Sequence, residues 1–171
     1  MQYTGNGIEG SNPSLSAIKK ALIDLGFFNG PAPYFLPCYT EFMSETLFTR
    51  IINGEIPSYK LYEDDKTFAF LDIHPVQPGH ILIVPKNPVE FVWDLPDDDY
   101  VAVMMTTKKL ALRIRERLGS TYVHERIIGV HVPHAHVQLI PFNHPDELQV
   151  QADFSAEPDH SALQEMASKL A

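Results

Sequence analysis

The chain has 171 residues, a single cysteine at Cys38 and a formal net charge of -9. The length suffices for one self-contained domain, and one cysteine excludes an internal disulfide framework, which favours a reducing, cytoplasmic setting. The acidic balance argues against binding to nucleic acid or anionic membranes, and no apolar run approaches the roughly 18 residues of a membrane span.

Residues 1–42 lack sustained hydrophobic periodicity and are rich in glycine and proline, apart from one candidate amphipathic helix over 14–26. The run from Gly10 to Pro13, Gly-Ser-Asn-Pro, is what the genetic code gives for a GGTTCGAATCC-type sequence, which resembles the T arm of a transfer RNA gene. Two alternatives stay open: a flexible, disordered tail, or an over-extended reading frame whose translation starts at Met43. We expect the folded domain to be residues 43–171.

The folded part is predicted to open with a short helix followed by strands. Ser44 or Thr46 can cap the helix N-terminus, and Gly54 can end the helix. A proline-bounded loop over 72–80 separates the second strand from the third. These first strands are expected over 58–63, 67–71 and 81–84, with a turn at Asp64-Asp65.

A long helix is the clearest element of the chain. Asp94 and Pro96 signal its start, an apolar stripe runs from Tyr100 to Leu118, and Gly119 follows as a stop. Later elements are expected as strands over 122–128 and 132–140 and a closing helix over 160–170. Hairpin strands beside one long helix indicate an α+β fold, with an antiparallel sheet of about five strands, one long helix and short flanking helices.

The strand expected over residues 132–140 carries the strongest functional signal. His134, His136 and Gln138 recur there at period two, so in a strand they line one face. Two imidazoles and an amide make a poor hydrophobic core but a good cradle for an anion, and we expect a phosphate. A structural role and a metal site are the alternatives. The metal is disfavoured because His131 faces the opposite side and Gln138 is a weak ligand.

Five ordered motifs run from the first helix to this strand: Arg50-Ile-Ile-Asn-Gly-Glu-Ile-Pro57, Tyr62-Glu-Asp-Asp65, Ala69-Phe-Leu-Asp-Ile73, Pro78-Gly-His80 and the His134/His136/Gln138 series. Together they resemble the histidine-triad (HIT) superfamily of nucleotide hydrolases and transferases, in its small bacterial-type form with His-x-His-x-Gln in place of the full triad. The resemblance implies a HIT-like fold, covalent nucleotidyl transfer, no cofactor and a homodimer.

The resemblance also implies roles for single residues. His136 occupies the position of the nucleophile, which attacks the α-phosphorus and forms a nucleotidyl-histidine; His134 matches the first triad histidine, which orders the strand. Asp72 matches an acid that binds ribose hydroxyls, although it could simply cap its loop, and His80 matches a histidine beside the phosphate. The residues that match the apolar walls of the base site are Phe48, Ile51, Ile56, Phe70 and Ile73. These residues could also be ordinary core, and such a site would have only a weak preference for purines.

Gln138 departs from the full triad, because most members carry a third histidine there. A glutamine amide can donate to a phosphoryl oxygen but cannot act as a general acid, which favours leaving groups that depart as anions. We therefore interpret the chain as a nucleotide hydrolase that cleaves a phosphate anhydride or phosphoramidate. The alternatives are a nucleotidyltransferase or dinucleoside polyphosphate phosphorylase, like other members with Gln here, or a non-catalytic nucleotide-binding module. A divalent-metal hydrolase fits least.

Two further departures concern the surroundings of the triad. Thr46 and Thr49 stand where some bacterial members carry a zinc-binding Cys pair, so we expect that structural metal to be absent. Residues 123–129 depart from the Asn- and Ser-bearing, glycine-rich loop that usually supplies phosphate donors. The candidate replacements, or else ordinary surface residues, are His124, Arg126 and His131.

Overall fold

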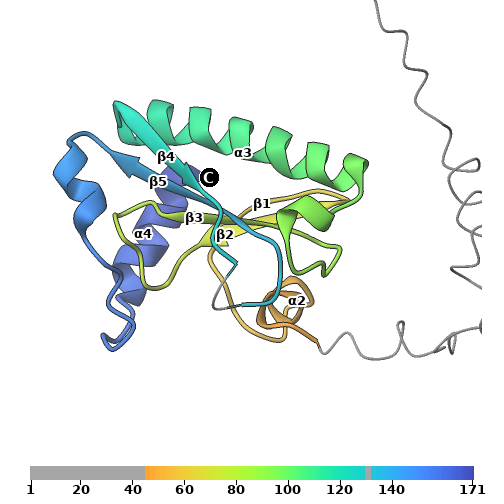
Figure 1. Ribbon diagram of the computed structural model, residues 1–171. Coiled ribbons are helices and arrows are strands. Elements are labelled where there is room, and N and C mark those ends of the chain that lie inside the picture. Colours follow the sequence, from red (N-terminus) through yellow and green to blue (C-terminus); the bar gives the residue numbers. More distant parts are fainter. Residues whose placement is uncertain (1–44, 130–131) are drawn as a thin grey trace, which may run out of the picture. The chain divides into compact units, whose positions relative to one another are not determined.

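The computed structural model describes residues 45–129 and 132–171. Their strands form one antiparallel sheet in the order β1-β2-β3-β5-β4 (Figure 1). The strands are β1 (Lys60–Glu63), β2 (Thr67–Leu71), β3 (Ile81–Pro85), β4 (Tyr122–Arg126) and β5 (Val137–Phe142). The helices are α2 (Leu47–Ile52), α3 (Asp97–Leu118) and α4 (His160–Leu170), with 3-10 helices η1 (Val92–Asp94) and η2 (Pro145–Gln149). This confirms the α+β class; the expectations for residues 1–42, Ser44 and His131 fall outside the described residues.

Alternate side chains of the strands divide the sheet into two faces. One face packs against α3 and α4, and its buried strand residues are Ala69, Leu71, Ile81, Ile83, Val137 and Leu139. The opposite face packs against α2, through Phe68, Phe70, Leu82 and Val84. In Figure 1 the long helix α3 and the short helix α2 accordingly lie on opposite sides of the sheet.

The register of β5 determines which face Gln138 occupies. Gln138 lies opposite Leu82 of β3 on one side and Arg126 of β4 on the other. Because directly opposed residues of neighbouring strands point to the same face, all three project away from α3. Gln138 and Arg126 are therefore neighbours on the α2 side of the sheet.

The prediction that this strand starts at residue 132 is wrong, because β5 begins only at Val137 and ends at Phe142. The preceding backbone forms a turn. The His134 N–H donates to the Val132 carbonyl (2.8 Å), and the Ala135 N–H donates to Val89 (2.7 Å) instead of to a neighbouring strand. Smaller corrections apply to β4, which ends at residue 126 rather than 128, and to β1, which begins at residue 60 rather than 58.

The helix ends agree better with the sequence. Thr46 is the N-cap of α2, and its side chain accepts a hydrogen bond from the Thr49 N–H. The helix α3 begins directly after Pro96 and ends at Gly119, whose φ of 68° is a left-handed conformation that favours glycine. In the ranges that the structure describes, no helix combines the length and apolar character needed to cross a membrane.

Candidate active site

His134 is fully buried, and both of its ring nitrogens have partners inside the protein. Its Nε2 lies 2.8 Å from the Pro85 carbonyl oxygen, which can only accept, so Nε2 carries the proton. Nδ1 therefore accepts a hydrogen bond from the Thr46 hydroxyl at 2.7 Å. Burial is the main cause that lowers the pKa of His134 below its usual 6.5, which keeps the ring neutral. His134 thus fastens the turn before β5 to β3 and to the start of α2.

The Thr46 hydroxyl links this histidine to the helix cap. Its oxygen accepts from the Thr49 N–H at 3.1 Å and lies 3.0 Å from the Thr49 hydroxyl. These are the two positions at which the family resemblance placed a Cys pair, and neutral hydroxyls in a closed hydrogen-bond network do not supply the thiolates that a structural zinc prefers. Across residues 45–129 and 132–171, no cluster of three or more His, Cys, Asp or Glu side chains is arranged to hold a metal.

His136 follows two residues later and is held by the backbone of His134. Its Nδ1 lies 2.8 Å from the His134 carbonyl oxygen, so Nδ1 carries the proton and the lone pair belongs to Nε2. The ring also packs edge-on against Phe48 of α2, with ring centroids 5.2 Å apart. The main chain therefore fixes both the tautomer and the orientation of an imidazole that can act as a nucleophile.

His80 is buried and hydrogen-bonded to the third residue of the motif. The Val76 N–H donates to its Nδ1 at 3.3 Å, so Nε2 carries the proton and donates to Gln138 Oε1 at 3.1 Å. Burial is the main cause that lowers the pKa of His80, and Arg126 and His136 act in the same direction. Asp72 opposes this effect, with its Oδ2 3.5 Å from His80 Nδ1. Because Nδ1 of the neutral ring carries a lone pair, this contact is a close approach and not an ion pair.

Arg126 of β4 contacts the third residue of the motif. Its Nε–H donates to Gln138 Oε1 at 2.9 Å, so the same oxygen receives hydrogen bonds from Arg126 and from His80. The sequence suggested Arg126 only as one of three candidate replacements for missing phosphate donors. The signal that identifies it is its register against Gln138, which depends on how β4 and β5 pair.

The residues expected around the ribose and the base are less uniformly placed. Asp72 accepts a hydrogen bond from the His74 N–H through Oδ1 (2.9 Å), so it does cap its loop, while its side chain remains about one-fifth exposed. Four of the five apolar candidates belong to or pack against the cluster beneath α2: Phe48, Ile51, Phe70 and Ile56. Ile73 is 43% exposed and is not a member of this cluster.

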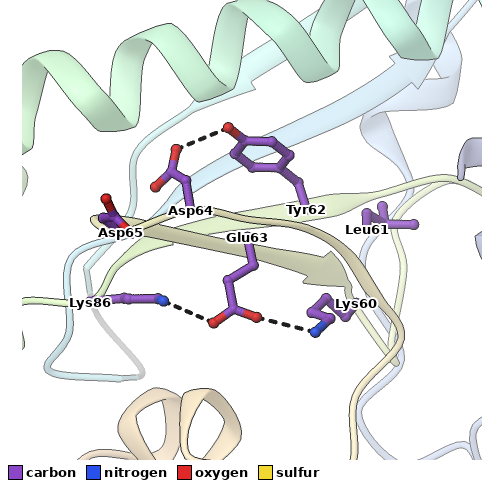
Figure 2. A pocket seen from close by; sticks show the side chains of 7 residues that line it. All are labelled: Lys60, Leu61, Tyr62, Glu63, Asp64, Asp65 and Lys86. Carbon is purple, nitrogen blue, oxygen red and sulfur yellow. Dashed lines mark hydrogen bonds and ion pairs between the residues drawn. The ribbon is translucent and has the colours of Figure 1, made fainter.

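A separate cavity of about 580 Å³ lies beside β1 and the end of β3 (Figure 2). The residues that line it are Lys60, Leu61, Tyr62, Glu63, Asp64, Asp65 and Lys86. Glu63 bridges Lys60 and Lys86, and the Tyr62 hydroxyl donates to Asp64. Its lining includes none of the residues expected to bind a nucleotide, and four of its charged side chains are hydrogen-bonded within the protein.

Comparisons with known proteins agree with the motifs. A family model described as the HIT domain matches residues 53–144. The chain is 37% identical to an uncharacterized HIT-like protein of Borreliella burgdorferi over 106 residues, 58% of this chain and 76% of that protein. It is 38% identical to the adenosine 5'-monophosphoramidase HNT1 of Candida albicans over 104 residues, 56% of this chain and 68% of that protein. A solved Hit-like protein of Bartonella henselae is similar with a TM-score of 0.65 and 26% identity, covering 73% of this chain and 93% of that one.

Proposed function

The chain belongs to the HIT domain family, and from that premise we propose that it is a nucleotide hydrolase that works through a nucleotidyl-histidine intermediate on His136. The substrate is a nucleoside phosphate anhydride or phosphoramidate. The single observation that carries the proposal is the hydrogen bond between His136 Nδ1 and the His134 carbonyl, because it assigns the lone pair to Nε2. Two relatives that are named adenosine 5'-monophosphoramidase, from Candida albicans and Saccharomyces cerevisiae, support a nucleotide substrate.

The proposed reaction has two displacements at the α-phosphorus. In the first, the lone pair of His136 Nε2 forms an N–P bond while the bond to the leaving group breaks, and the electron pair departs with that group. An anhydride leaving group departs as an anion and needs no proton, whereas the nitrogen of a phosphoramidate takes its proton from solvent water. The proton on Nδ1 stays in its hydrogen bond to His134, so the intermediate is a nucleotidyl-imidazolium. In the second, water attacks phosphorus, the N–P bond breaks, its electron pair returns to Nε2, and the proton of the water passes to solvent. Nucleoside monophosphate is released.

The other candidate residues would then hold the nucleotide. In this proposal Asp72 accepts hydrogen bonds from the ribose hydroxyls through Oδ2, since Oδ1 already serves the loop. His80 orients Gln138 beside the phosphate, and the apolar residues under α2 form part of the base site. Apolar walls stack on a base without reading its edge, so the preference for purines is expected to be weak.

A second candidate function is a nucleotidyltransferase or dinucleoside polyphosphate phosphorylase. Gln138 favours it, because an amide at the third position cannot protonate a leaving group, whereas phosphate or a sugar phosphate could accept the nucleotidyl group as readily as water. A non-catalytic nucleotide-binding module is the third reading. The ordered tautomer of His136 argues against it, since binding alone does not need a nucleophile.

We also propose that the protein is a cytoplasmic homodimer. The edge strand β4 and the outer face of α3 would form the interface, and that face of the helix exposes Val101, Met105 and Leu112. Light scattering during size-exclusion chromatography should give twice the mass of the chain, and Met105→Glu should shift the measured mass toward that of a single chain. A monomer at every concentration would contradict the dimer.

Product analysis tests the proposed function. Wild type, His136→Ala and His144→Ala would be incubated with adenosine phosphoramidate and with a dinucleoside polyphosphate, with and without inorganic phosphate. His144 is an exposed histidine before η2 and serves as the matched control. Monophosphate formed without added phosphate by wild type and His144→Ala, but not by His136→Ala, supports the hydrolase. Diphosphate formed only with added phosphate supports the phosphorylase. Nucleotide binding without turnover supports the binding module.

A further inference from the structure

Arg126 and Gln138 face each other across neighbouring strands at the third position of the histidine motif. They are directly opposed in the β4–β5 ladder, and the Arg126 Nε–H donates to Gln138 Oε1 at 2.9 Å. No carboxylate within residues 45–129 and 132–171 forms an ion pair with Arg126. A guanidinium keeps its charge throughout the physiological pH range. A permanent positive charge therefore lies beside the motif, and no carboxylate of the described part of the chain is bound to it.

The same hydrogen bonds hold the Gln138 amide in one orientation. Its Oε1 accepts from Arg126 Nε and from His80 Nε2, whereas a flipped amide would oppose its NH2 group to two donors. The amide nitrogen therefore points away from both. None of the described residues accepts a hydrogen bond from it, yet no buried side-chain nitrogen or oxygen in the described part lacks a partner. It follows that this nitrogen is not fully buried and keeps contact with solvent as a donor directed away from both groups.

We propose that Arg126 binds the phosphate of the nucleotide, and that its terminal Nη groups and the outward NH2 of Gln138 form one anion-binding face next to His136. This inference rests on the proposed function and narrows its substrate class. The pair supplies the positive charge that a protonated histidine would supply at the third position, but no transferable proton. It suits a substrate whose leaving group departs as a phosphate or nucleotide anion.

The chemistry of the two substrate classes differs at this point. When the bridging P–O bond of an anhydride breaks, its electron pair stays on a phosphate oxygen, and Arg126 stabilises the new charge without any proton transfer. When the P–N bond of a phosphoramidate breaks, the nitrogen must gain a proton, which neither the guanidinium nor the amide can give. The enzyme should therefore prefer anhydrides.

Calorimetric binding of AMP and adenosine tests the role of Arg126, because the two ligands differ only in the phosphate. The variants are Arg126→Met, Arg126→Lys and the control Arg117→Met, which removes an exposed arginine from the end of α3. We expect Arg126→Met to weaken AMP binding by roughly 10- to 100-fold, the range for losing a charged hydrogen-bond donor, and to change adenosine binding by less than about twofold. Lysine keeps the positive charge but lacks the planar guanidinium that can donate two hydrogen bonds, so the AMP affinity of Arg126→Lys should lie between those of wild type and Arg126→Met. Arg117→Met should match wild type.

Turnover provides the second readout. Wild type should have a higher kcat/KM for a dinucleoside polyphosphate than for adenosine phosphoramidate, and Arg126→Met should lose more on the anhydride. Unchanged AMP affinity in Arg126→Met, or equal weakening of AMP and adenosine, would overturn the proposal and leave Arg126 a structural partner of Gln138. If wild type binds AMP but turns over no nucleotide, the proposed function is contradicted. The comparison of AMP and adenosine binding between wild type and Arg126→Met would still decide the role of Arg126. Wild type that binds neither ligand would refute both.

Discussion

Replacing Thr46 by valine should destabilise the fold and disturb the candidate nucleophile at the same time. Valine has nearly the shape of threonine but has a methyl group in place of the hydroxyl. The Thr46 hydroxyl makes two separable contributions: it accepts from the Thr49 N–H as the cap of α2, and it donates to Nδ1 of the buried His134. The substitution removes both while leaving the packing volume almost unchanged.

The expected magnitude follows from these two contacts. Loss of a threonine N-cap costs about 1 kcal/mol. His134 Nδ1 is then left as a buried acceptor without a donor, which costs about 1–3 kcal/mol. The free energy of unfolding should therefore fall by about 2–4 kcal/mol in total. Because the His134 carbonyl orients the ring of His136, any shift of this turn should also lower kcat.

Urea denaturation of wild type, Thr46→Val and Thr46→Ser would measure the effect. Serine keeps the hydroxyl for both contacts, so Thr46→Ser should stay within about 1 kcal/mol of wild type, the cost of one partly buried methyl group. The denaturation slope should not change among the three, since the folded surface is the same. If Thr46→Val and Thr46→Ser unfold at the same urea concentration, the link between the hydroxyl and His134 carries no stability and the reasoning is wrong.

Three further predictions concern pH, the loop before β3 and the third motif position. Burial holds the pKa of His80 and His134 below 6.5, so below about pH 6.5 the unfolded chain binds more protons than the folded one. As the pH falls, the free energy of unfolding should decrease by up to about 1.4 kcal/mol per pH unit for each ring. Urea midpoints that stay constant from pH 8 to 5 would contradict the neutral state assigned to the two rings. Gly119→Ala meets no atom within 4 Å and should lower the free energy of unfolding by about 1 kcal/mol because of its left-handed φ. Gly79→Ala, which also has a positive φ, would place a Cβ 2.7 Å from Leu118 Cδ1 and 3.2 Å from Pro141 Cγ; Leu118 must shift, so the loss should exceed that of Gly119→Ala, and equal unfolding midpoints would refute this. Gln138→His should raise kcat/KM on substrates with poor leaving groups such as adenosine phosphoramidate, and no change would show that protonation of the leaving group does not limit the rate.

The elements that were predictable from the sequence are those whose ends carry local signals. Thr46 caps α2, Gly119 ends α3, and the hairpin strand over 67–71 is bounded by a polar turn, so short-range chemistry determines these boundaries. The family was predictable for a related reason, because its motifs are contiguous. The start of β5 was not, since period-two spacing of His134, His136 and Gln138 describes a strand equally well whether or not a neighbouring strand accepts its hydrogen bonds.

The partners of the histidines depend on contacts between distant segments and could not be derived from spacing. His134 bonds to Thr46 across 88 residues, and His80 bonds to Gln138 across 58. Arg126 lies only 12 residues from Gln138, yet a shift of one residue between β4 and β5 would have turned it to the α3 face. Its place in the site is therefore a property of strand register, which local sequence does not specify.

The two kinds of hydrogen bond in the site imply where substrate preference is set. The tautomers of His134, His136 and His80 are fixed by the main chain, through the Pro85 carbonyl, the His134 carbonyl and the Val76 N–H respectively. Side-chain substitutions that do not move the backbone leave these groups in place, so they should not change the tautomer of His136, the proposed nucleophile. Gln138 is different, because among the described residues its amide is held by the side chains of His80 and Arg126 and not by the main chain. We therefore expect changes at positions 126 and 138 to alter the preferred leaving group without changing the proposed attack by His136. The paired variant Arg126→Met/Gln138→His should move the preference toward phosphoramidates further than either change alone.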